Sequence, residues 1–212
     1  MPSDEGTTTA GVIRALRRAI LDGTHAPGSQ LREAQLAAEL GVSRGPLREA
    51  FSRLEEEGLI VRVAFRGAFV REVTAQTVRE ISDLRQLIEP EAVERAAEQL
   101  GDALPLQLDE LVQALRSAAD AGDLPATIES HLAFHRFFYE HSSNRLFAQM
   151  WADWETQLRL FLVVEHQQQH DLNDLAGSHE RLVQLVRAGR MKQFRAELAR
   201  HVHPAPPRPP RS

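Results

Sequence analysis

The chain has 212 residues, of which 42% are hydrophobic, and its 25 basic and 30 acidic side chains give a net charge of −5. This composition is typical of a globular protein with one large domain or two small ones. Cysteine is absent, which excludes disulfides, thiolate metal ligands and cysteine nucleophiles. No apolar run reaches about 18 residues and no basic start precedes an apolar block, so we expect a cytoplasmic protein without signal peptide or membrane span.

The charge is unevenly distributed along the chain. Residues 1–73 hold ten arginines and ten acidic residues, whereas residues 74–212 carry the whole net charge of −5. Nucleic-acid binding by the first segment would therefore depend on locally clustered arginines, because phosphates respond to the charges that reach the duplex. The plainer interpretation is that scattered arginines form a solvated surface.

The first segment begins with two predicted helices. Residues 1–8 are small and polar and are expected to be a disordered start. Apolar residues at helical spacing predict a helix over residues 9–21. A short second helix follows, with Leu31 as the first residue of its apolar face and Gly41 as the glycine that ends it.

A third helix and a hairpin complete the segment. Ser43 is the predicted N-cap of this helix, Pro46 lies in its first turn, and Gly58 ends it. The β-rich runs LIVRV and AFVREV flank residues 64–67 and predict a hairpin. We therefore expect residues 9–73 to form a winged helix-turn-helix of three helices plus a β-hairpin.

The remaining residues are predicted to be helical throughout. A long amphipathic helix opens this part, with Leu84 and Leu87 on its apolar face and Pro90 forcing a kink or a break. Turn residues then divide residues 74–203 into an all-α antiparallel bundle of about six helices. The later helices are expected at about 126–141, 145–165, 175–188 and 191–203, with the polar stretch HQQQHDLND as a separator, and residues 204–212 are expected to be a disordered, proline-rich tail.

Arginines mark the face of the third helix that would meet DNA. Arg44 lies in its first turn and Arg48 four residues later, opposite the apolar positions. In a helix-turn-helix, the second helix of the motif enters the major groove, where guanidinium groups bind guanine edges and phosphates. Arg32, at the start of the preceding helix, and Arg66-Gly67, at the hairpin tip, are further candidates for backbone and minor-groove contacts. The alternative for each arginine is an ordinary surface position.

Histidines gather in the second segment, where eight of the nine lie after residue 130. His131 and His135 are one helical turn apart, a spacing that lets two imidazoles hold one metal ion. His179 and His201 lie ten residues before and twelve residues after Gly189, so antiparallel helices joined there would carry both to the same level. Each histidine alone is more often structural or solvated, but together the four predict a metal site.

The other histidines have no such spacing. A substitute role for His203 in place of its neighbour is disfavoured. The rest are expected to be surface residues: His25, His141, His166 and His170.

Four pieces of the first segment, PGSQLRE, LAAELGVSRGPLREA, RLEEEGLI and RGAFV, occur in a fixed order and spacing. Residues 12–72 thereby resemble the DNA-binding domain of the GntR superfamily of bacterial transcription regulators. Gly45 departs from the family, which usually has threonine there, and so removes a hydroxyl that could bind a phosphate. The DNA contacts that the resemblance implies are Arg32, Arg44, Arg48, Arg66 and Gly67.

The histidine-rich segment contains LRQLIEPEAVERAA, LAFHRFFYEHSSNRLF and SHERLVQLVRAGRMKQFRAELARHV. Residues 76–203 are thereby similar to the FCD ligand-binding domain of the FadR-like subfamily, which commonly holds a divalent metal with an Asp and three His. His131 stands here at the position of the Asp, and the other three ligands are matched by His135, His179 and His201. Four imidazoles would favour Zn²⁺ or Ni²⁺ over Mn²⁺ or Mg²⁺. A three-ligand site without His131, with an extra open position, is the alternative.

The same resemblance implies an effector site beside the metal. Arg85, on the first bundle helix, is the matched residue for pairing with a small carboxylate that also reaches an open metal position. A surface ion pair with Glu89, four residues further on, is the alternative. Asn144 is expected to cap the helix that follows it.

The predicted function is a DNA-binding transcription regulator whose affinity for double-stranded operator DNA is controlled by a small organic acid at the metal. A homodimer is implied by the resemblance and by palindromic half-site geometry. In an alternative, the metal itself is the signal. A metalloenzyme is disfavoured, because the residues between His131 and His135 include no general base, and we expect no catalytic activity.

Overall fold

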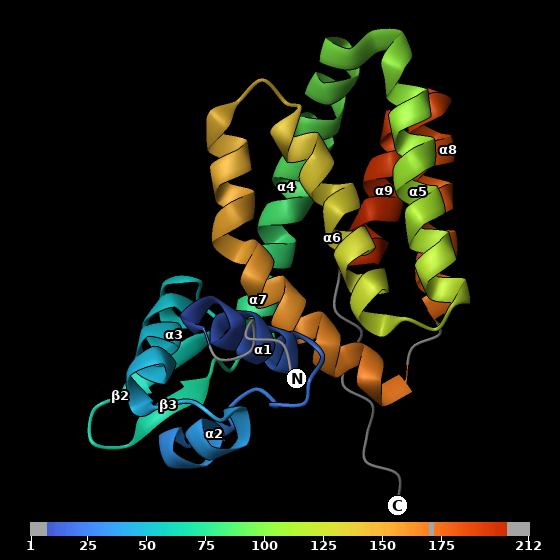
Figure 1. Cartoon of the computed structure of the whole chain (residues 1–212). Coiled ribbons are helices and arrows are strands. Elements are labelled where there is room, and N and C mark those ends of the chain that lie inside the picture. The colour runs from blue at the N-terminus through green and yellow to red at the C-terminus, as the bar shows by residue number, and fades with distance from the viewer. Residues whose placement is uncertain (1–7, 170–171, 203–212) are drawn as a thin grey trace, which may run out of the picture. The chain divides into compact units, whose positions relative to one another are not determined.

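The computed structural model describes residues 8–169 and 172–202, which are mostly helical (Figure 1). The chain forms two compact units, of which the first comprises the chain up to Val73 together with Thr156–Gln169 and the second comprises the rest. An N-terminal winged helix-turn-helix and a helical C-terminal part are both present, so the predicted mainly α fold is confirmed.

The first unit is built on α1 (Thr9–Leu21), α2 (Glu33–Leu40) and α3 (Arg44–Glu56). α2 ends at Gly41, whose φ of +65° is the left-handed conformation that glycine adopts without strain. Ser43 occupies the N-cap position of α3, but its side chain makes no capping hydrogen bond. Apolar side chains of α1 and α3 at helical spacing form the core between them: Val12, Leu16, Ile20, Leu47, Ala50, Phe51 and Leu54.

A small antiparallel sheet completes the winged fold. The predicted hairpin consists of β2 (Ile60–Val63) and β3 (Gly67–Val70), paired from Ile60 with Val70 to Val63 with Gly67. A further strand, β1 (Gln30–Leu31), pairs with β3 on its other side and gives the order β1-β3-β2. The assignment of Leu31 to the second helix was therefore wrong. Two residues are too few to show the alternation that identifies a strand from sequence.

One helix, α7 (Arg145–Gln169), contributes to both units. Its later part supplies Leu160 to the core of the first unit, and the Thr156 hydroxyl donates to the Glu57 carbonyl at 3.3 Å. The sequence predicted an end near residue 165 and a polar separator after it. That boundary was wrong, because the helix continues through the glutamines, which are good helix formers.

The second unit is an antiparallel bundle. α5 packs against α6 and α8, while α9 packs against α4 and α8. A short 3₁₀ turn at Gly101–Ala103 joins α4 to α5. The bundle's helices, with the early part of α7, are α4 (Ala75–Leu100), α5 (Leu104–Asp120), α6 (Leu124–Glu140), α8 (Leu172–Arg187) and α9 (Met191–Val202). Their core includes Leu108, Phe134, Phe138, Leu182 and Leu198.

The long helix α4 differs from its prediction in two respects. A break at Pro90, one of the two expected outcomes, is absent, since the helix runs through this residue. Leu84 and Leu87, expected on its apolar face, are exposed, whereas the polar residues Arg85 and Glu89 are buried. The predicted face is correct at both ends of the helix, where Val78, Ile81, Ala92 and Ala96 are buried. It was wrong in the middle, where the buried side chains are polar and lie beside the histidines of the neighbouring helices.

Hydropathy adds one observation. Among the described residues, even the longest helices, α4 and α7, lack a stretch apolar enough to span a bilayer.

Candidate metal centre and nucleic-acid interface

Three helices of the second unit bring four histidines together. His131 and His135 come from α6, His179 from α8 and His201 from α9, and one ring nitrogen of each lies within 4.8 Å of the others. The turn between α8 and α9 contains Gly189 at φ +61°, the left-handed conformation that reverses the chain. Three of the histidines are buried and His201 is half-buried. The structure thus brings together all four residues singled out from their spacing.

Two of these rings are oriented by groups on α8. The His179 Nδ1 lies 2.8 Å from the Leu175 carbonyl oxygen, which only accepts, so this nitrogen carries the proton. The Ser178 hydroxyl donates to the same carbonyl at 2.6 Å and has no second proton to give. The His201 Nδ1, 3.0 Å from that hydroxyl, must therefore donate to it. Both rings consequently have an unprotonated Nε2 when neutral.

The third ring is oriented by a buried carboxyl group. Glu89 is assigned as a carboxylate because its other oxygen pairs with the Arg85 guanidinium, so the His135 Nδ1 donates to Glu89 Oε1 at 2.5 Å and its Nε2 is also unprotonated. That Nε2 lies 3.1 Å from the Nε2 of His201 and 3.2 Å from the Nε2 of His179. Unprotonated nitrogens this close repel one another unless a cation lies between them.

The electrostatics of the cluster suit a metal cation. Burial lowers the pKa of His179 to about 4 and holds the pKa values of His131, His135 and His201 well below the ordinary value. The imidazoles are therefore neutral at pH 7, which is the form that binds metals. Zn–N bonds of about 2.0–2.1 Å place two tetrahedral ligands about 3.3 Å apart, close to the 3.1 Å and 3.2 Å that separate the His135 Nε2 from its two neighbours. The His131 Nδ1 is buried without a hydrogen-bond partner and is the remaining ligand atom.

A buried ion pair lies beside the histidines. The Arg85 Nε donates to Glu89 Oε2 at 3.0 Å, with the two side chains 4% and 1% exposed. The Arg85 guanidinium also lies over the Trp151 ring at 5.5 Å, and its Nη2 is buried without a partner. Burial raises the pKa of Glu89, an effect that Arg85 and Tyr139 oppose. The pairing of Arg85 with Glu89 was anticipated, but its placement on the surface was wrong.

Other sequence expectations have simpler outcomes. Asn144 caps α7 as predicted, since its side-chain oxygen accepts from the Leu146 backbone N–H at 3.0 Å. His25 and His141 lie outside the cluster and are half-buried rather than fully exposed. The other expected or considered histidines lie outside what the structure describes, which includes the backbone of His166 but not its side chain and omits His170 and His203.

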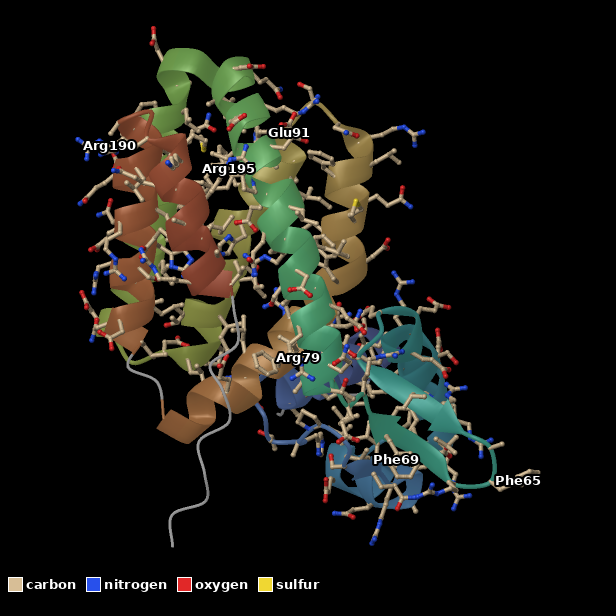
Figure 2. The ribbon with its side chains drawn as sticks, turned by 180° about the vertical axis from the view of Figure 1, so that it is seen from behind. Phe65, Phe69, Arg79, Glu91, Arg190 and Arg195 are labelled. Atoms are coloured by element: carbon tan, nitrogen blue, oxygen red, sulfur yellow. The ribbon has the colours of Figure 1, made fainter. Side chains whose placement is uncertain are left out.

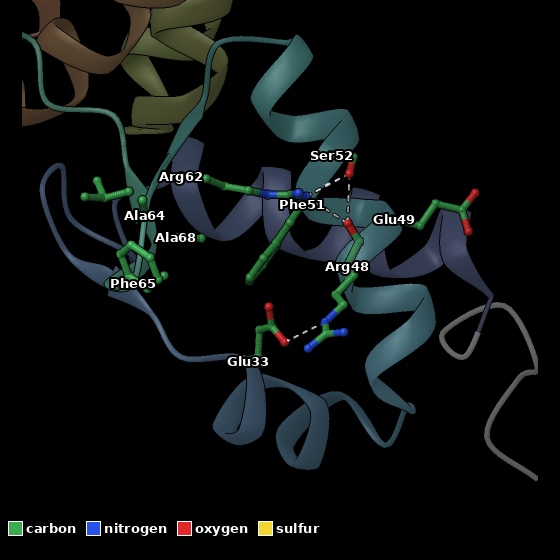
Figure 3. A pocket seen from close by; sticks show the side chains of 11 residues that line it. Glu33, Arg48, Glu49, Phe51, Ser52, Arg62, Ala64, Phe65 and Ala68 are labelled. Carbon is green, nitrogen blue, oxygen red and sulfur yellow. Dashed lines mark hydrogen bonds and ion pairs between the residues drawn. The ribbon is translucent and has the colours of Figure 1, made fainter.

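On the first unit, the arginines of α3 are exposed. Arg44 is the first residue of the helix, and the Arg48 side chain is 65% exposed. The Arg48 Nε donates to Glu33 Oε2 of α2 at 3.0 Å, as Figure 3 shows. Arg32, which immediately precedes α2, is also exposed. Exposed ion pairs of this kind contribute little to stability, so Arg48 can exchange its partner at small cost.

A groove of about 460 Å³ separates α3 from the hairpin, with Arg48 on one side and Phe65 on the other (Figure 3). Arg62, from β2, joins its two sides. The Arg62 Nη2 donates to the Arg48 carbonyl at 3.0 Å and to the Ser52 hydroxyl at 2.8 Å. Arg62 was not among the residues predicted from the sequence. Its partners on α3 lie 10 and 14 positions away along the chain, so the sequence does not reveal these contacts.

The hairpin tip presents the remaining predicted residues. Arg66 and Gly67 are exposed, and Gly67 has φ +95°. The Gln30 amide of β1 donates to the Arg66 carbonyl at 2.7 Å and so braces the tip. Phe65 is fully exposed and projects away from the unit (Figure 2). The five predicted DNA-contacting residues are thus all exposed on the winged unit.

Comparison with known families decides the class of protein. The family model described as "Bacterial regulatory proteins, gntR family" matches residues 8–70, and the model of the FCD domain matches residues 80–204. The chain belongs to the gntR family. Its C-terminal part is an FCD domain, and the protein is a DNA-binding transcription regulator.

Individual relatives of this gntR-family regulator agree with the assignment. It is 27% identical to an uncharacterised HTH-type transcriptional regulator, YdhC, of Bacillus subtilis, over 81% of this chain and 77% of the relative. It is 35% identical to the transcriptional repressor RspR of Escherichia coli, over 64% of this chain but only 59% of the length of that repressor. The solved structure of E. coli McbR/YncC is similar with a TM-score of 0.70 and 25% identity, covering 92% of each chain.

Proposed function

We propose that this gntR-family regulator reads its operator through the winged unit. Arg44 and Arg48 would enter the major groove, because both are exposed at the start of α3. Arg66 and Gly67 would contact the minor groove from the hairpin tip, while Arg32 would bind a phosphate. The pairing of Arg48 with Glu33 supports this reading, since a phosphate or guanine edge can replace an exposed carboxylate.

The regulatory part of the proposal is a divalent metal held by the four histidines. The observation that carries it is the approach of three unprotonated Nε2 atoms, with separations of 3.1 Å and 3.2 Å from His135. The unpartnered Nδ1 of His131 supports its inclusion as the fourth ligand. Imidazole ligands without a carboxylate favour Zn²⁺ or Ni²⁺ over Mn²⁺ and Mg²⁺. When bound, the metal supplies a Lewis-acidic centre for an anionic ligand.

A small carboxylate is the proposed effector. The unpartnered Nη2 of Arg85 supports this, because a buried N–H donor without an acceptor is costly and a carboxylate would satisfy it. A relative from Bacillus licheniformis, 25% identical over 85% of this chain, is named as a gluconate operon transcriptional repressor. Sugar acids therefore belong among the first ligands to test.

Effector binding would act through a homodimer with two winged units on a palindromic operator. A ligand changes operator affinity only if it binds the two conformations of the dimer unequally. The carboxylate would thus favour one separation of the two α3 helices over another.

A second candidate function follows from the number of imidazoles. Four histidine ligands complete a tetrahedral site and leave no position for an effector, as in structural zinc centres. In that case the metal itself is the signal. Ni²⁺ with a higher coordination number, or a site without His131, would leave a position open for the carboxylate.

One titration distinguishes these functions. A duplex is selected from a random-sequence library by the wild-type protein, and its affinity is measured by fluorescence anisotropy with metal-free, Zn²⁺-loaded and Ni²⁺-loaded protein. Each form is tested with acetate, succinate, citrate and gluconate. A change that requires both metal and acid supports the effector proposal, whereas a change with metal alone supports the metal sensor. If the loaded and metal-free proteins bind the duplex equally under all conditions, the regulatory proposal is wrong.

A further inference from the structure

Glu89 lies between the histidines and the arginine of the proposed effector site. Its Oε1 accepts from the His135 Nδ1 at 2.5 Å and its Oε2 accepts from the Arg85 Nε at 3.0 Å. We propose that Glu89 is a positioning residue that presents the His135 Nε2 to the metal and makes anion binding at Arg85 depend on metal loading. The proposal rests on the proposed metal-binding function of this site.

The first step concerns the proton on His135. Neutral imidazole exists in two tautomers, and only the one with the proton on Nδ1 offers Nε2 as a ligand. His179 and His201 are oriented by a carbonyl and a hydroxyl, whereas His135 is oriented by a carboxylate. A carboxylate partner fixes the ring and raises the basicity of the ligating nitrogen more than a neutral partner does. His135 is therefore expected to be the strongest ligand of the set.

The second step concerns Arg85. Its Nε is held by Glu89 and its guanidinium lies 5.5 Å from the Trp151 ring, so the group has few alternative positions. This orientation leaves the buried Nη2 as the donor available to an added ligand. One carboxylate thus orients a metal ligand with one oxygen and the anion-binding group with the other.

The third step is a balance of buried charge. Without a metal, the charges of the buried Arg85–Glu89 ion pair balance each other, and the histidines are neutral. A divalent ion adds two positive charges without any anionic ligand among the four imidazoles. A buried excess of positive charge is costly, and a bound carboxylate reduces it. Metal and carboxylate are therefore expected to bind with positive coupling, each raising the affinity for the other.

The test uses Glu89→Gln in the full-length chain, which removes the charge and keeps the shape of the side chain. We expect the Kd for Zn²⁺, measured by competition with a chelator, to increase by about 10- to 100-fold, the range for loss of such a partner. Glu91→Gln is the matched control, since Glu91 lies on the same helix and pairs with Arg95 at i+4, but on the surface. Its Kd should stay within about 2-fold of wild type. Equal Zn²⁺ affinity in Glu89→Gln and wild type would overturn the proposal.

A spectroscopic readout covers the case in which Glu89→Gln fails to fold. In metal-free wild-type protein labelled with ¹⁵N-histidine, long-range ¹H–¹⁵N spectra report which ring nitrogen of His135 carries the proton, with His135→Phe used for assignment. A proton on Nδ1 is expected, and a proton on Nε2 would overturn the proposal. Because this measurement needs no metal, it separates failure of the inference from failure of metal binding by the wild-type protein.

The coupling has its own measurement. The Kd for Ni²⁺, whose higher coordination number leaves a position open for an acid, is determined at increasing concentrations of citrate, succinate and gluconate. A parallel titration of the chelator alone corrects for metal bound by the acid in solution. We expect citrate to tighten Ni²⁺ binding by wild type by about 5-fold or more, the lower end of typical couplings. No tightening by citrate, succinate or gluconate would refute the charge-balance step.

Discussion

The two predicted sites of this regulator differ in how their charged groups are held. At the histidine cluster, Arg85 and Glu89 are 4% and 1% exposed and pair with each other. On the winged unit, Arg48 and Glu33 are 65% and 38% exposed. Water screens the exposed pair, so exchange of its partner costs little, whereas the loss of a buried partner leaves an uncompensated charge. The proposed sensor site therefore holds its charges in a buried pair, whereas the proposed DNA-binding surface can exchange the partners of its arginines.

The largest effect is expected from removing a buried ligand. His179→Ala should weaken Zn²⁺ binding by at least about 100-fold, or roughly 2.7 kcal/mol, because it deletes one of the converging Nε2 atoms. Metal content after dialysis and chelator competition measure this. His25→Ala, outside the cluster, is the control and should retain wild-type affinity. Full metal occupancy in His179→Ala would remove the residue from the site.

Metal should also stabilise the folded protein. At a free Zn²⁺ concentration about 100 times the Kd, the free energy of unfolding should rise by roughly 2.7 kcal/mol, provided that the metal binds only the folded state. Thermal unfolding followed by circular dichroism gives the shift in Tm, and EDTA should reverse it. An unchanged Tm at saturating Zn²⁺ would contradict a rigid, preformed site.

Loss of a single exposed arginine should lower the affinity for DNA and leave the free energy of unfolding almost unchanged. Arg48→Ala should weaken binding to the selected duplex by about 1–3 kcal/mol, the cost of one good base or phosphate contact. Its free energy of unfolding should change by no more than about 0.5 kcal/mol, as for other surface changes. Anisotropy and denaturant titration measure the two quantities. Wild-type affinity for the duplex would contradict the assignment of α3 to the major groove.

The smallest change in DNA affinity is expected when the exposed partner of Arg48 loses its charge. Glu33→Gln removes the carboxylate that competes with DNA for Arg48. Binding to the selected duplex should become tighter by up to about 1 kcal/mol, the upper range for exposed ion pairs, and the gain should fall as salt increases. In the Arg48→Ala variant, adding Glu33→Gln should increase the affinity for the duplex by a smaller amount. Weaker binding by Glu33→Gln would mean that Glu33 positions Arg48 for DNA instead of competing for it.

Much of the fold was predictable because local signals were strong. Apolar residues at helical spacing gave α1 its correct bounds, and the two β-rich runs predicted β2 and β3. The predictions failed where the local signal was short or weak. This was the case for β1, which has only two residues, and for the end of α7. The middle of the buried face of α4 was also misassigned, because the period alone does not reveal that Arg85 and Glu89, and not the leucines, are turned inward.

The amino-acid sequence by itself determined the family, the order of the elements and the positions of the arginines and histidines, because these depend on residue type and on spacing within one element. Tertiary structure alone decided which nitrogen of each imidazole faces the cluster, that Glu89 joins His135 to Arg85, and that Glu33 is the partner of Arg48. The reason is that periodicity reports which residues share a face of their own helix. The atoms opposite that face belong to other elements, and only their packing brings them within hydrogen-bond distance.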